Sequence, residues 1–139
     1  MQNKFLSYFR YYKDEKTNID FSWWYCITDC AVYNTSQLYE LFGYSSKSEI
    51  IDSDKFIEFD KVDIIELKRK YCFQIICNKN HRKYKFFELL SDNIFDVEFN
   101  KFIDANNLIR DWYQYEKNAL EIAFLNWTKL HNVIINQFN

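Results

Sequence analysis

The chain contains a single glycine, Gly43, and no proline. Phosphate-binding loops of the P-loop and Rossmann kinds need several glycines at fixed spacing, because the backbone there turns tightly and approaches the phosphate closely. A nucleophile elbow needs glycines on both sides of its serine. The sequence therefore excludes these three architectures, and with them a large share of nucleotide-binding and hydrolytic enzymes.

The 139 residues fit one domain, so we predict a single domain over residues 1–139. Aromatic residues make up 21% of the chain, and the core must therefore be built largely from rings. The net charge of -2 gives no global attraction to nucleic acid or to an anionic membrane. No apolar run reaches the roughly 18 residues of a membrane span, and the N-terminus has no secretory signal. We expect a cytoplasmic protein with reduced cysteines and no membrane partner.

Residues 19–36 are rich in aromatic and β-branched side chains. Thr28 and Asp29 offer a turn between two runs of this kind, at 21–27 and 30–35. Such runs on either side of a short polar turn are typical of a β-hairpin.

Four further segments complete the N-terminal half. Residues 3–13 carry aromatic side chains at three- and four-residue steps, which predicts a short amphipathic helix. A helical turn at 37–44 is expected to end at Gly43. We predict a loop at 45–54 and a third strand at 55–59, where apolar and polar residues alternate.

The next part of the chain is predicted to be helical. Residues 61–79 fit either one helix or two strands, at 62–67 and 71–77. We favour the helix, because 19 residues without a turn signal are long for a strand. The sequence of residues 81–107 then predicts two short helices.

The clearest element is a long helix at the C-terminal end. Its apolar residues recur every three to four positions and should form a buried face, with Trp112 and Trp127 in the core. Together with the hairpin, this helix predicts an α+β fold, in which a small N-terminal antiparallel sheet packs on a helical C-terminal half. The residues expected on the buried face are Leu108, Trp112, Tyr115, Ala119, Ile122, Trp127, Leu130 and Ile134.

Taken in order, these features resemble an uncharacterised bacterial protein family, family 0158, over about residues 20–130. Members usually show a glycine before an F-x-x-F pair and an arginine inside it, where this chain has Val97-Glu98 and Asn100-Lys101. The resemblance implies an α+β fold with a helical C-terminal half, and it implies no activity. The features that match are the hairpin Trp23–Tyr33, the strand Phe56–Phe59, the pair Phe99 and Phe102, and a last helix with Trp112, Tyr115, Ala119, Ala123 and Trp127.

One acid-x-lysine pattern, Glu66 and Lys68, is of the type found in metal-dependent nucleases. With Asp52 or Asp54, Glu66 would hold Mg²⁺, and the lysine would assist the attacking water. On a helix, however, residues two positions apart diverge, and both become ordinary solvated charges. We therefore assign no catalytic residues, and keep a Mg²⁺-dependent nuclease as the third functional hypothesis.

The four cysteines form two spaced pairs, Cys26 with Cys30 and Cys72 with Cys77. All four, with His81 as a further candidate, could form a zinc site. Neither pair has the tight two-residue spacing that zinc sites favour, and buried small hydrophobic residues are the usual role of free cysteines. We expect no metal and no cofactor.

A basic cluster follows in the helical half, interleaved with Tyr71 and Tyr84. Such a cluster can neutralise phosphates while the rings stack on bases, so nucleic-acid binding is the alternative function. Acidic residues gather just upstream, and a dipolar surface serves a protein partner equally well. The cluster consists of Lys68, Arg69, Lys70, Lys79, Arg82, Lys83 and Lys85.

Large rings on both sides of the hairpin give the leading hypothesis. Trp23 and Trp24 point to opposite faces of a strand, and a two-stranded hairpin turns only one face to the core. We expect the surplus rings, among Trp23, Trp24, Tyr25 and Tyr33, to form a patch for a protein partner. The predicted function is a small non-catalytic binding protein, acting as a regulator, inhibitor or immunity-type antagonist, whose oligomeric state stays open.

Overall fold

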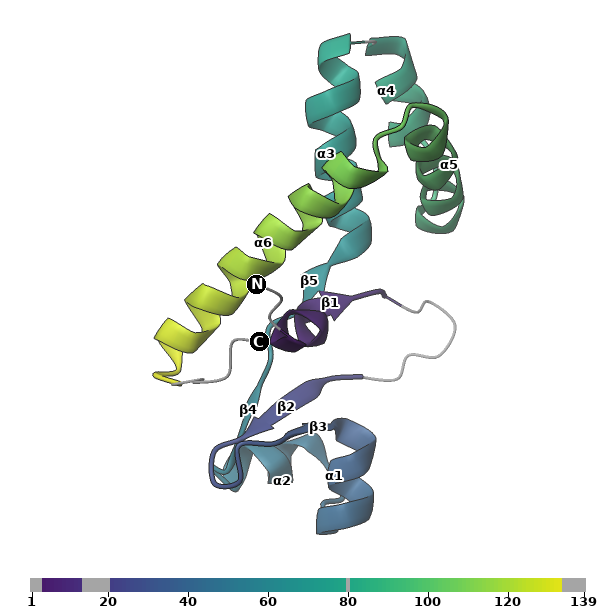
Figure 1. Cartoon of the computed structure of the whole chain (residues 1–139). Coiled ribbons are helices and arrows are strands. Elements are labelled where there is room, and N and C mark those ends of the chain that lie inside the picture. Colours follow the sequence, from purple (N-terminus) through teal and green to yellow (C-terminus); the bar gives the residue numbers. More distant parts are fainter. Residues whose placement is uncertain (1–3, 14–20, 80, 134–139) are drawn as a thin grey trace. The chain divides into compact units, whose positions relative to one another are not determined.

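The chain, as a computed structural model, is described over residues 4–13, 21–79 and 81–133 (Figure 1). It divides into two compact units, which we treat separately. The sheet unit draws its described residues from the segments 1–9, 13–61 and 123–139. The helical unit consists of residues 10–12 and 62–122.

The sheet unit contains a three-stranded antiparallel sheet with strand order β3-β2-β4. Trp24 in the central strand lies opposite Tyr33 on one side and Glu58 on the other. The predicted hairpin and the third strand are therefore confirmed. The elements are the 3-10 helix η1 (Lys4–Phe9), β2 (Trp23–Cys26), β3 (Val32–Asn34), α1 (Thr35–Phe42), α2 (Lys47–Asp52) and β4 (Phe56–Glu58).

Helix α1 begins and ends as its sequence indicates. The side chain of Asn34 accepts a hydrogen bond from the Gln37 N–H, and the Gln37 side chain accepts one from the Asn34 N–H, both at 2.8 Å. This reciprocal capping box satisfies two N–H groups that a helix end otherwise leaves open. Gly43 ends the helix in the left-handed conformation, with φ 76°, which glycine adopts without steric cost.

Two predictions for the N-terminal half are wrong. The helix expected over residues 3–13 is a short 3-10 helix that ends at Phe9, because the chain then turns into a strand. The loop expected at 45–54 contains α2. The hydroxyl of Ser46 accepts from the Glu49 N–H at 3.3 Å, and a fully buried Ile50 anchors the helix. A Ser-x-x-Glu helix start was thus present in the sequence.

Both faces of the sheet are covered. On one face, Trp24 packs with Leu38 and Ile50, and its indole N–H donates to the Thr35 hydroxyl at 3.0 Å. On the other face, Tyr25 meets Trp127, which belongs to the last turns of the C-terminal helix. The sheet is therefore enclosed within its own unit.

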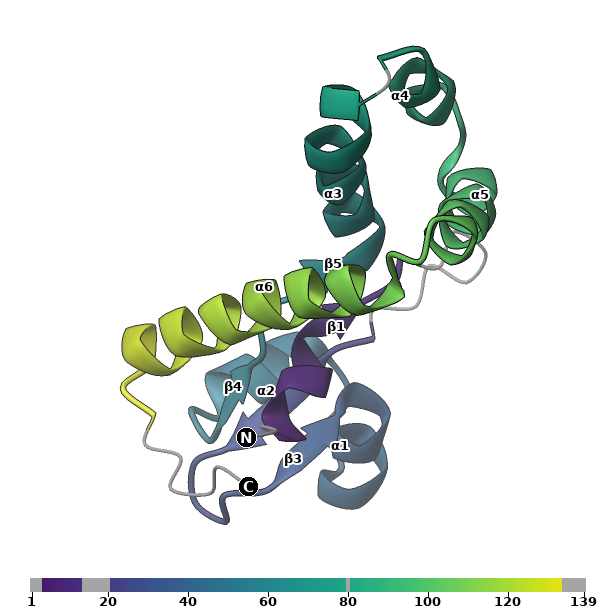
Figure 2. The same cartoon turned by 45° about the horizontal axis from the view of Figure 1, so that its top comes forward.

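The helical unit is built from helices and one short parallel strand pair, β1 with β5, in which Arg10 lies opposite Val62. The helix predicted over 61–79 is confirmed from Ile64 to Lys79, whereas Val62 and Asp63 form β5, and the two short helices after it are confirmed. The core of this unit consists largely of rings and branched aliphatic side chains around Trp112. The elements are β1 (Arg10–Tyr11), β5 (Val62–Asp63), α3 (Ile64–Lys79), α4 (His81–Glu88), α5 (Asp92–Ala105) and α6 (Ile109–Leu130), of which α6 continues into the sheet unit (Figure 2).

The buried face of α6 is partly as predicted. Trp112 and Trp127 are buried, which confirms the core role of both. Ile122, however, is 60% exposed, and Phe124 is buried in its place. At about 100° per residue, two positions separate these side chains by about 200°, so only one can face the core. Leu130 is exposed as well.

The long closing helix and the N-terminal antiparallel sheet confirm the α+β fold class. Among the described helices, none combines the length and the apolar character needed to cross a membrane. The two units each have a ring-rich core, and each leaves a different kind of surface open.

Candidate functional site

The hairpin does not present a free face of rings. Trp24 and Tyr25 are buried, and Trp23 is half-buried between Tyr8, at 4.8 Å between ring centroids, and Phe21, at 5.4 Å. The expectation that Trp24 and Tyr25 are exposed is wrong, because α1 and α2 cover the Trp24 face of the sheet and Trp127 of α6 contacts Tyr25 on the other face. Burial, followed by a hydrogen bond with the Cys30 thiol, raises the pKa of Tyr25 to about 12.

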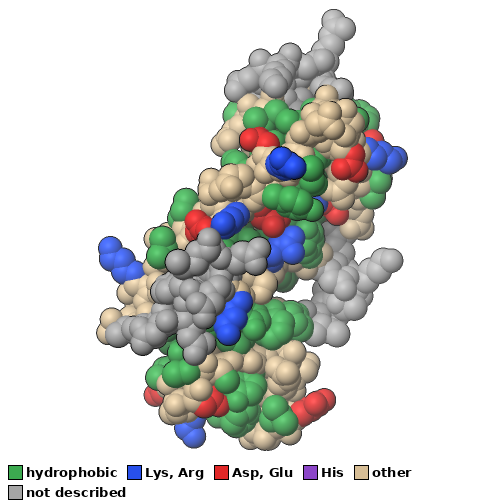
Figure 3. All heavy atoms as spheres, in the orientation of Figure 1, with side chains coloured by type: hydrophobic (Ala, Val, Ile, Leu, Met, Phe, Trp, Pro, Cys, Tyr) green, Lys and Arg blue, Asp and Glu red, His purple; other side chains and the backbone are tan. Residues whose placement is uncertain are grey.

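The surplus of apolar surface lies on α1 instead. Leu38 is fully buried, whereas Leu41 is 68% exposed and Phe42 is 46% exposed. Phe42 contacts Tyr33 edge to face, with ring centroids 5.3 Å apart, and lies 6.3 Å from the ring of Tyr44. Hydrophobic side chains lie open over α1 and α2 at the bottom of Figure 3. We define the α1 surface as Tyr33, Tyr39, Leu41, Phe42 and Tyr44.

This surface has a local sequence pattern that could have revealed it. Apolar residues stand at four positions of α1, namely Leu38, Tyr39, Leu41 and Phe42. At about 100° per residue they span about 160° of the helix circumference. Leu38 is fully buried, whereas Tyr39, Leu41 and Phe42 keep part of their apolar surface in water.

The segment that carries the α1 surface is acidic. Residues 21–60 contain seven carboxylates and two lysines, which gives a formal charge of -5. Asp29 accepts from the Tyr33 hydroxyl at 2.7 Å and from the Ala31 N–H at 2.9 Å, and these bonds lower the pKa of its carboxyl. The Ser45 hydroxyl and N–H lower the pKa of Glu49 in the same way. Both carboxylates are therefore ionised at neutral pH.

Two residues of the basic cluster, Lys68 and Arg69, have a structural role. Lys68 is only 5% exposed, and its ammonium donates to Asp96 at 2.5 Å and to the Asn100 side-chain oxygen at 3.3 Å. Arg69 donates to the backbone oxygen of Leu90 and to the Asp92 carboxylate, both at 2.9 Å. These two cations hold helices together and are not available to phosphates.

The remaining cations of the cluster form no described patch. Lys70 is exposed and pairs with Glu66 at 3.7 Å, and Lys85 is exposed on α4. The side chains of Lys79, Arg82 and Lys83 lie outside those that the structure describes. The predicted nucleic-acid surface therefore loses Lys68 and Arg69.

The acid-x-lysine pattern does not form a catalytic pair. Glu66 lies on the exposed side of α3, and Lys68 lies on the buried side, as residues two positions apart on a helix must. Asp52 and Asp54 belong to the sheet unit. The described part of the chain contains no group of three or more His, Cys, Asp or Glu side chains that could hold a metal ion.

The cysteines are separated between the units. Cys26 is buried and Cys30 is exposed in the sheet unit, whereas Cys72 is buried in the helical unit. Burial raises the pKa of the Cys72 thiol to about 12. Cys72 thus has the environment of a small hydrophobic residue. The side chains of Cys77 and His81 lie outside the described ones.

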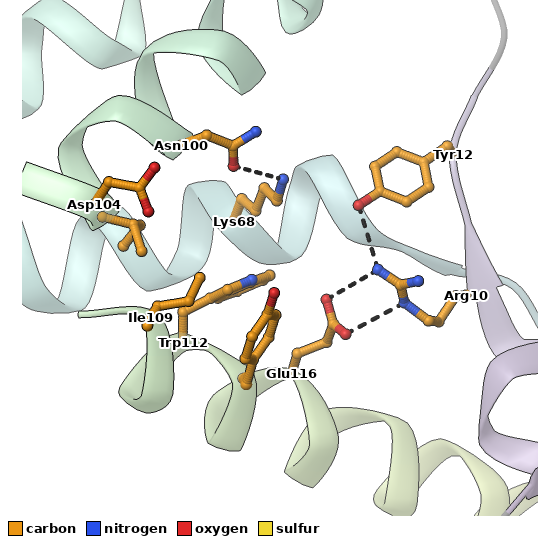
Figure 4. Close-up of a pocket in the computed structure, with 10 residues that line it drawn as sticks. Arg10, Tyr12, Lys68, Asn100, Asp104, Ile109, Trp112 and Glu116 are labelled. Atoms are coloured by element: carbon orange, nitrogen blue, oxygen red, sulfur yellow. Dashed lines mark hydrogen bonds and ion pairs between the residues drawn. The ribbon is translucent and has the colours of Figure 1, made fainter. Parts of the chain in front are cut away.

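The helical unit contains a cavity of about 360 Å³ that was not predicted from the sequence (Figure 4). Four elements line it: β1 with the residue after it, α3, α5 and α6. Trp112 and Glu116 are one helical turn apart on α6 and therefore face the same side. Lys68 forms part of the wall, with its ammonium 5.9 Å from the ring centroids of Tyr12 and Trp112.

The cations of the cavity are each paired with a carboxylate. The Arg10 guanidinium meets Glu116 through two nitrogens, at 3.2 Å and 3.4 Å, and it also donates to the Tyr12 hydroxyl at 3.4 Å. Lys68 is paired with Asp96. The residues that form these pairs lie far apart in the sequence, so only the tertiary structure brings them together.

Comparison with known proteins assigns no relationship. No family model, no curated protein and no solved structure matches the chain. The resemblance to family 0158 therefore stays a prediction. The structure offers two candidate binding features, the α1 surface of the sheet unit and the cavity of the helical unit.

Proposed function

We propose that this protein is a non-catalytic binding protein whose sheet unit docks on a basic protein partner through the α1 surface. The observation that carries the proposal is the exposure of Leu41 and Phe42 on a helix whose Leu38 is fully buried. Exposed apolar patches are typical of interaction sites, and aromatic residues are enriched among the side chains that dominate binding energy. The prediction of a partner-facing ring patch thus moves from the hairpin strands to α1 and keeps Tyr33.

The charge of this segment specifies the chemistry of the partner. With seven carboxylates against two lysines over residues 21–60, the docking region attracts a positively charged surface. Attraction between exposed charges is screened by salt, so the association rate should fall as ionic strength rises. A small binding protein of this kind would act as a regulator, inhibitor or antagonist of its partner.

A groove of about 390 Å³ in the same unit supports a basic partner. Its walls include the exposed side chains of Ile27 and Ile51, and the carboxylates of Asp54 and Glu58 also line it. A lysine or arginine has a long apolar stem and a charged head, which matches this combination of apolar wall and carboxylate.

Nucleic-acid binding is less well supported. Two cations of the basic cluster, Lys68 and Arg69, are held by carboxylates and by backbone oxygens. A phosphate would have to replace contacts on which the helical unit depends. Docking on a protein needs no such rearrangement.

The test is a capture experiment with matched variants of the full chain. The immobilised protein is exposed to a lysate of the organism that encodes it, after nuclease treatment, and the captured protein is then purified and its Kd measured. Phe42→Ser should weaken binding about 30-fold, which corresponds to about 2 kcal/mol for a central interface residue. Leu89→Ser, at a strongly exposed leucine of the helical unit, is the control and should bind as the wild type does.

Three results would reject the proposal. One is a captured protein whose Kd is the same for Phe42→Ser and for the wild type. Another is equal loss of binding in Leu89→Ser, and the third is an acidic partner or binding that increases with salt. Circular dichroism and thermal melting of both variants show that any loss of binding is not a loss of fold.

A further inference from the structure

Two cations and three carboxylates lie in or beside the cavity of the helical unit, and one of the carboxylates, Asp104, is unpaired among the described residues. Arg10 is compensated by Glu116, and Lys68 is compensated by Asp96. A phosphate or another multiply charged anion would therefore find no surplus of positive charge. Burying such a group would cost more free energy than these paired cations return. The cavity is suited to a ligand that carries no negative charge.

Two hydrogen-bond donors at the wall of the cavity lack acceptors among the described residues. Trp112 is only 4% exposed, and its indole nitrogen has no hydrogen-bond partner there, although the side chain lines the cavity. An ammonium group carries three hydrogens, and Lys68 uses two, on Asp96 and Asn100. Figure 4 shows the indole between Lys68 and Glu116. An oxygen of a ligand would satisfy both donors.

The same cavity offers an acceptor of the opposite kind. The carboxylate of Asp104, in the last turn of α5, has no hydrogen bond or ion pair among the described residues, and it lines the cavity. Asp104 is exposed, and a carboxylate at the rim of a cavity accepts hydrogen bonds from N–H donors. A ligand that reaches both ends of the cavity should therefore carry an amino group opposite its oxygen.

The exposed aromatic side chains that line the cavity indicate the shape of this ligand. Tyr12 and Tyr113 line it and are 45% and 60% exposed, in contrast to the fully packed Trp112. Flat rings left open at a binding site favour contact with another flat ring. The volume of about 360 Å³ lies at the lower end of the range of about 300–1,000 Å³ for small-molecule sites.

We propose that this cavity binds a small, uncharged, planar heterocycle that carries both a carbonyl oxygen and an amino group, the chemistry of cytosine and guanine. The carbonyl oxygen accepts from the indole N–H of Trp112 and from the third hydrogen of Lys68. The amino group donates to Asp104, and the ring lies against Tyr12 or Tyr113. This site is separate from the α1 surface, and the two proposals succeed or fail independently.

The experiment is a titration of the full-length protein with free nucleosides, followed by NMR and calorimetry. The indole N–H resonance of Trp112, assigned by its absence in Trp112→Phe, should shift on addition of cytidine or guanosine. Adenosine has no carbonyl oxygen and uridine has no amino group, so each should bind at least about tenfold more weakly. Cytidine 5′-monophosphate should bind no more tightly than cytidine.

A matched pair of variants tests the acceptor. Asp104→Ala removes an exposed carboxylate and should weaken cytidine binding at least about tenfold, because the amino group loses its partner. Glu88→Ala removes an exposed carboxylate of α4 that does not line the cavity, and it should bind cytidine as the wild type does. Thermal melting of both variants shows whether the helical unit stays folded.

The proposal would be overturned by any of four results. These are no shift of the Trp112 resonance at millimolar cytidine and guanosine, equal affinity for uridine and adenosine, unchanged affinity in Asp104→Ala, or tighter binding of the monophosphate. The last result would assign the cavity to anions instead. Titration with L-phenylalanine, a zwitterion with a ring, serves as a further arm, and binding as tight as that of cytidine would also reject the nucleobase class.

Discussion

The sheet unit and the helical unit each pack around a tryptophan of α6, but the two tryptophans have different neighbours. Trp127 in the sheet unit stacks on Phe59, with ring centroids 4.5 Å apart, and meets the edge of Phe9 at 5.7 Å. Trp112 in the helical unit meets Phe99 at 5.2 Å and also has the Lys68 ammonium at 5.9 Å from its ring. One core is thus made of rings, and the other includes a charge.

This difference decides what each unit leaves open. In the sheet unit, the indole N–H of Trp127 donates to the Glu58 backbone oxygen at 2.9 Å, and the rings left over appear as an apolar surface on α1. In the helical unit, the indole N–H of Trp112 has no acceptor among the described residues, and the side chain lines a polar cavity. A core of rings is compatible with a docking surface, whereas a core with an ammonium group is compatible with a small-molecule site.

The largest effects are expected from the tryptophans themselves. Truncation of a buried tryptophan to alanine removes its ring contacts and leaves a cavity, so Trp127→Ala and Trp112→Ala should each destabilise the protein by about 3–5 kcal/mol. Trp127→Ala should lie at the upper end, because it also leaves the Glu58 oxygen without its donor. Urea unfolding followed by circular dichroism gives both values. If either variant unfolds at the wild-type urea concentration, that side of α6 is a surface and the comparison of the two cores does not hold.

An intermediate effect is expected from the charge in the helical core. Asp96→Ala leaves the buried Lys68 ammonium without its carboxylate, which should cost about 1–3 kcal/mol, less than for a fully enclosed pair because the Asp96 side chain is partly exposed. Lys68→Met removes the charge and keeps a side chain of similar length, so its cost should stay within about 1 kcal/mol. Both values come from the same urea experiment.

The control for the charge is Lys70→Met. Lys70 is exposed and forms an ion pair with Glu66, one helical turn away. This substitution should leave the free energy of unfolding unchanged within about 0.5 kcal/mol. If Lys68→Met were as costly as Asp96→Ala, the ammonium itself would be a requirement of the helical core, and the distinction between the two units would be sharper than proposed.

The smallest effects are expected at two helix starts, one in each unit. Asn34→Ala breaks the capping box of α1 and should cost about 1 kcal/mol. Ser91 stands at the same position of α5 but makes no side-chain capping bond, so Ser91→Ala should change the free energy of unfolding by less than about 0.5 kcal/mol. Equal values at the two sites would show that the capping geometry does not distinguish the units.

Much of the secondary structure could be predicted from the sequence, because it depends on neighbouring residues. The turn of the hairpin, the end of α1 at Gly43 and the long closing helix follow from local residue preferences and from a repeat of three to four positions. The same repeat identified Trp112 and Trp127 as core residues. The start of α2 at Ser46 was equally local, and the prediction of a loop there overlooked it.

The tertiary structure alone decided which rings and charges are free. Trp24 became buried because Leu38 of α1 and Ile50 of α2 cover a face of the sheet that the hairpin by itself would leave open. Lys68 left the basic cluster because Asp96, 28 positions along the chain, lies beside it in the fold. A sequence determines local periodicity, and so it determined the helices and the tryptophans of α6. Exposure and ion pairing depend on which distant residues come into contact, and these contacts placed the α1 surface and the cavity.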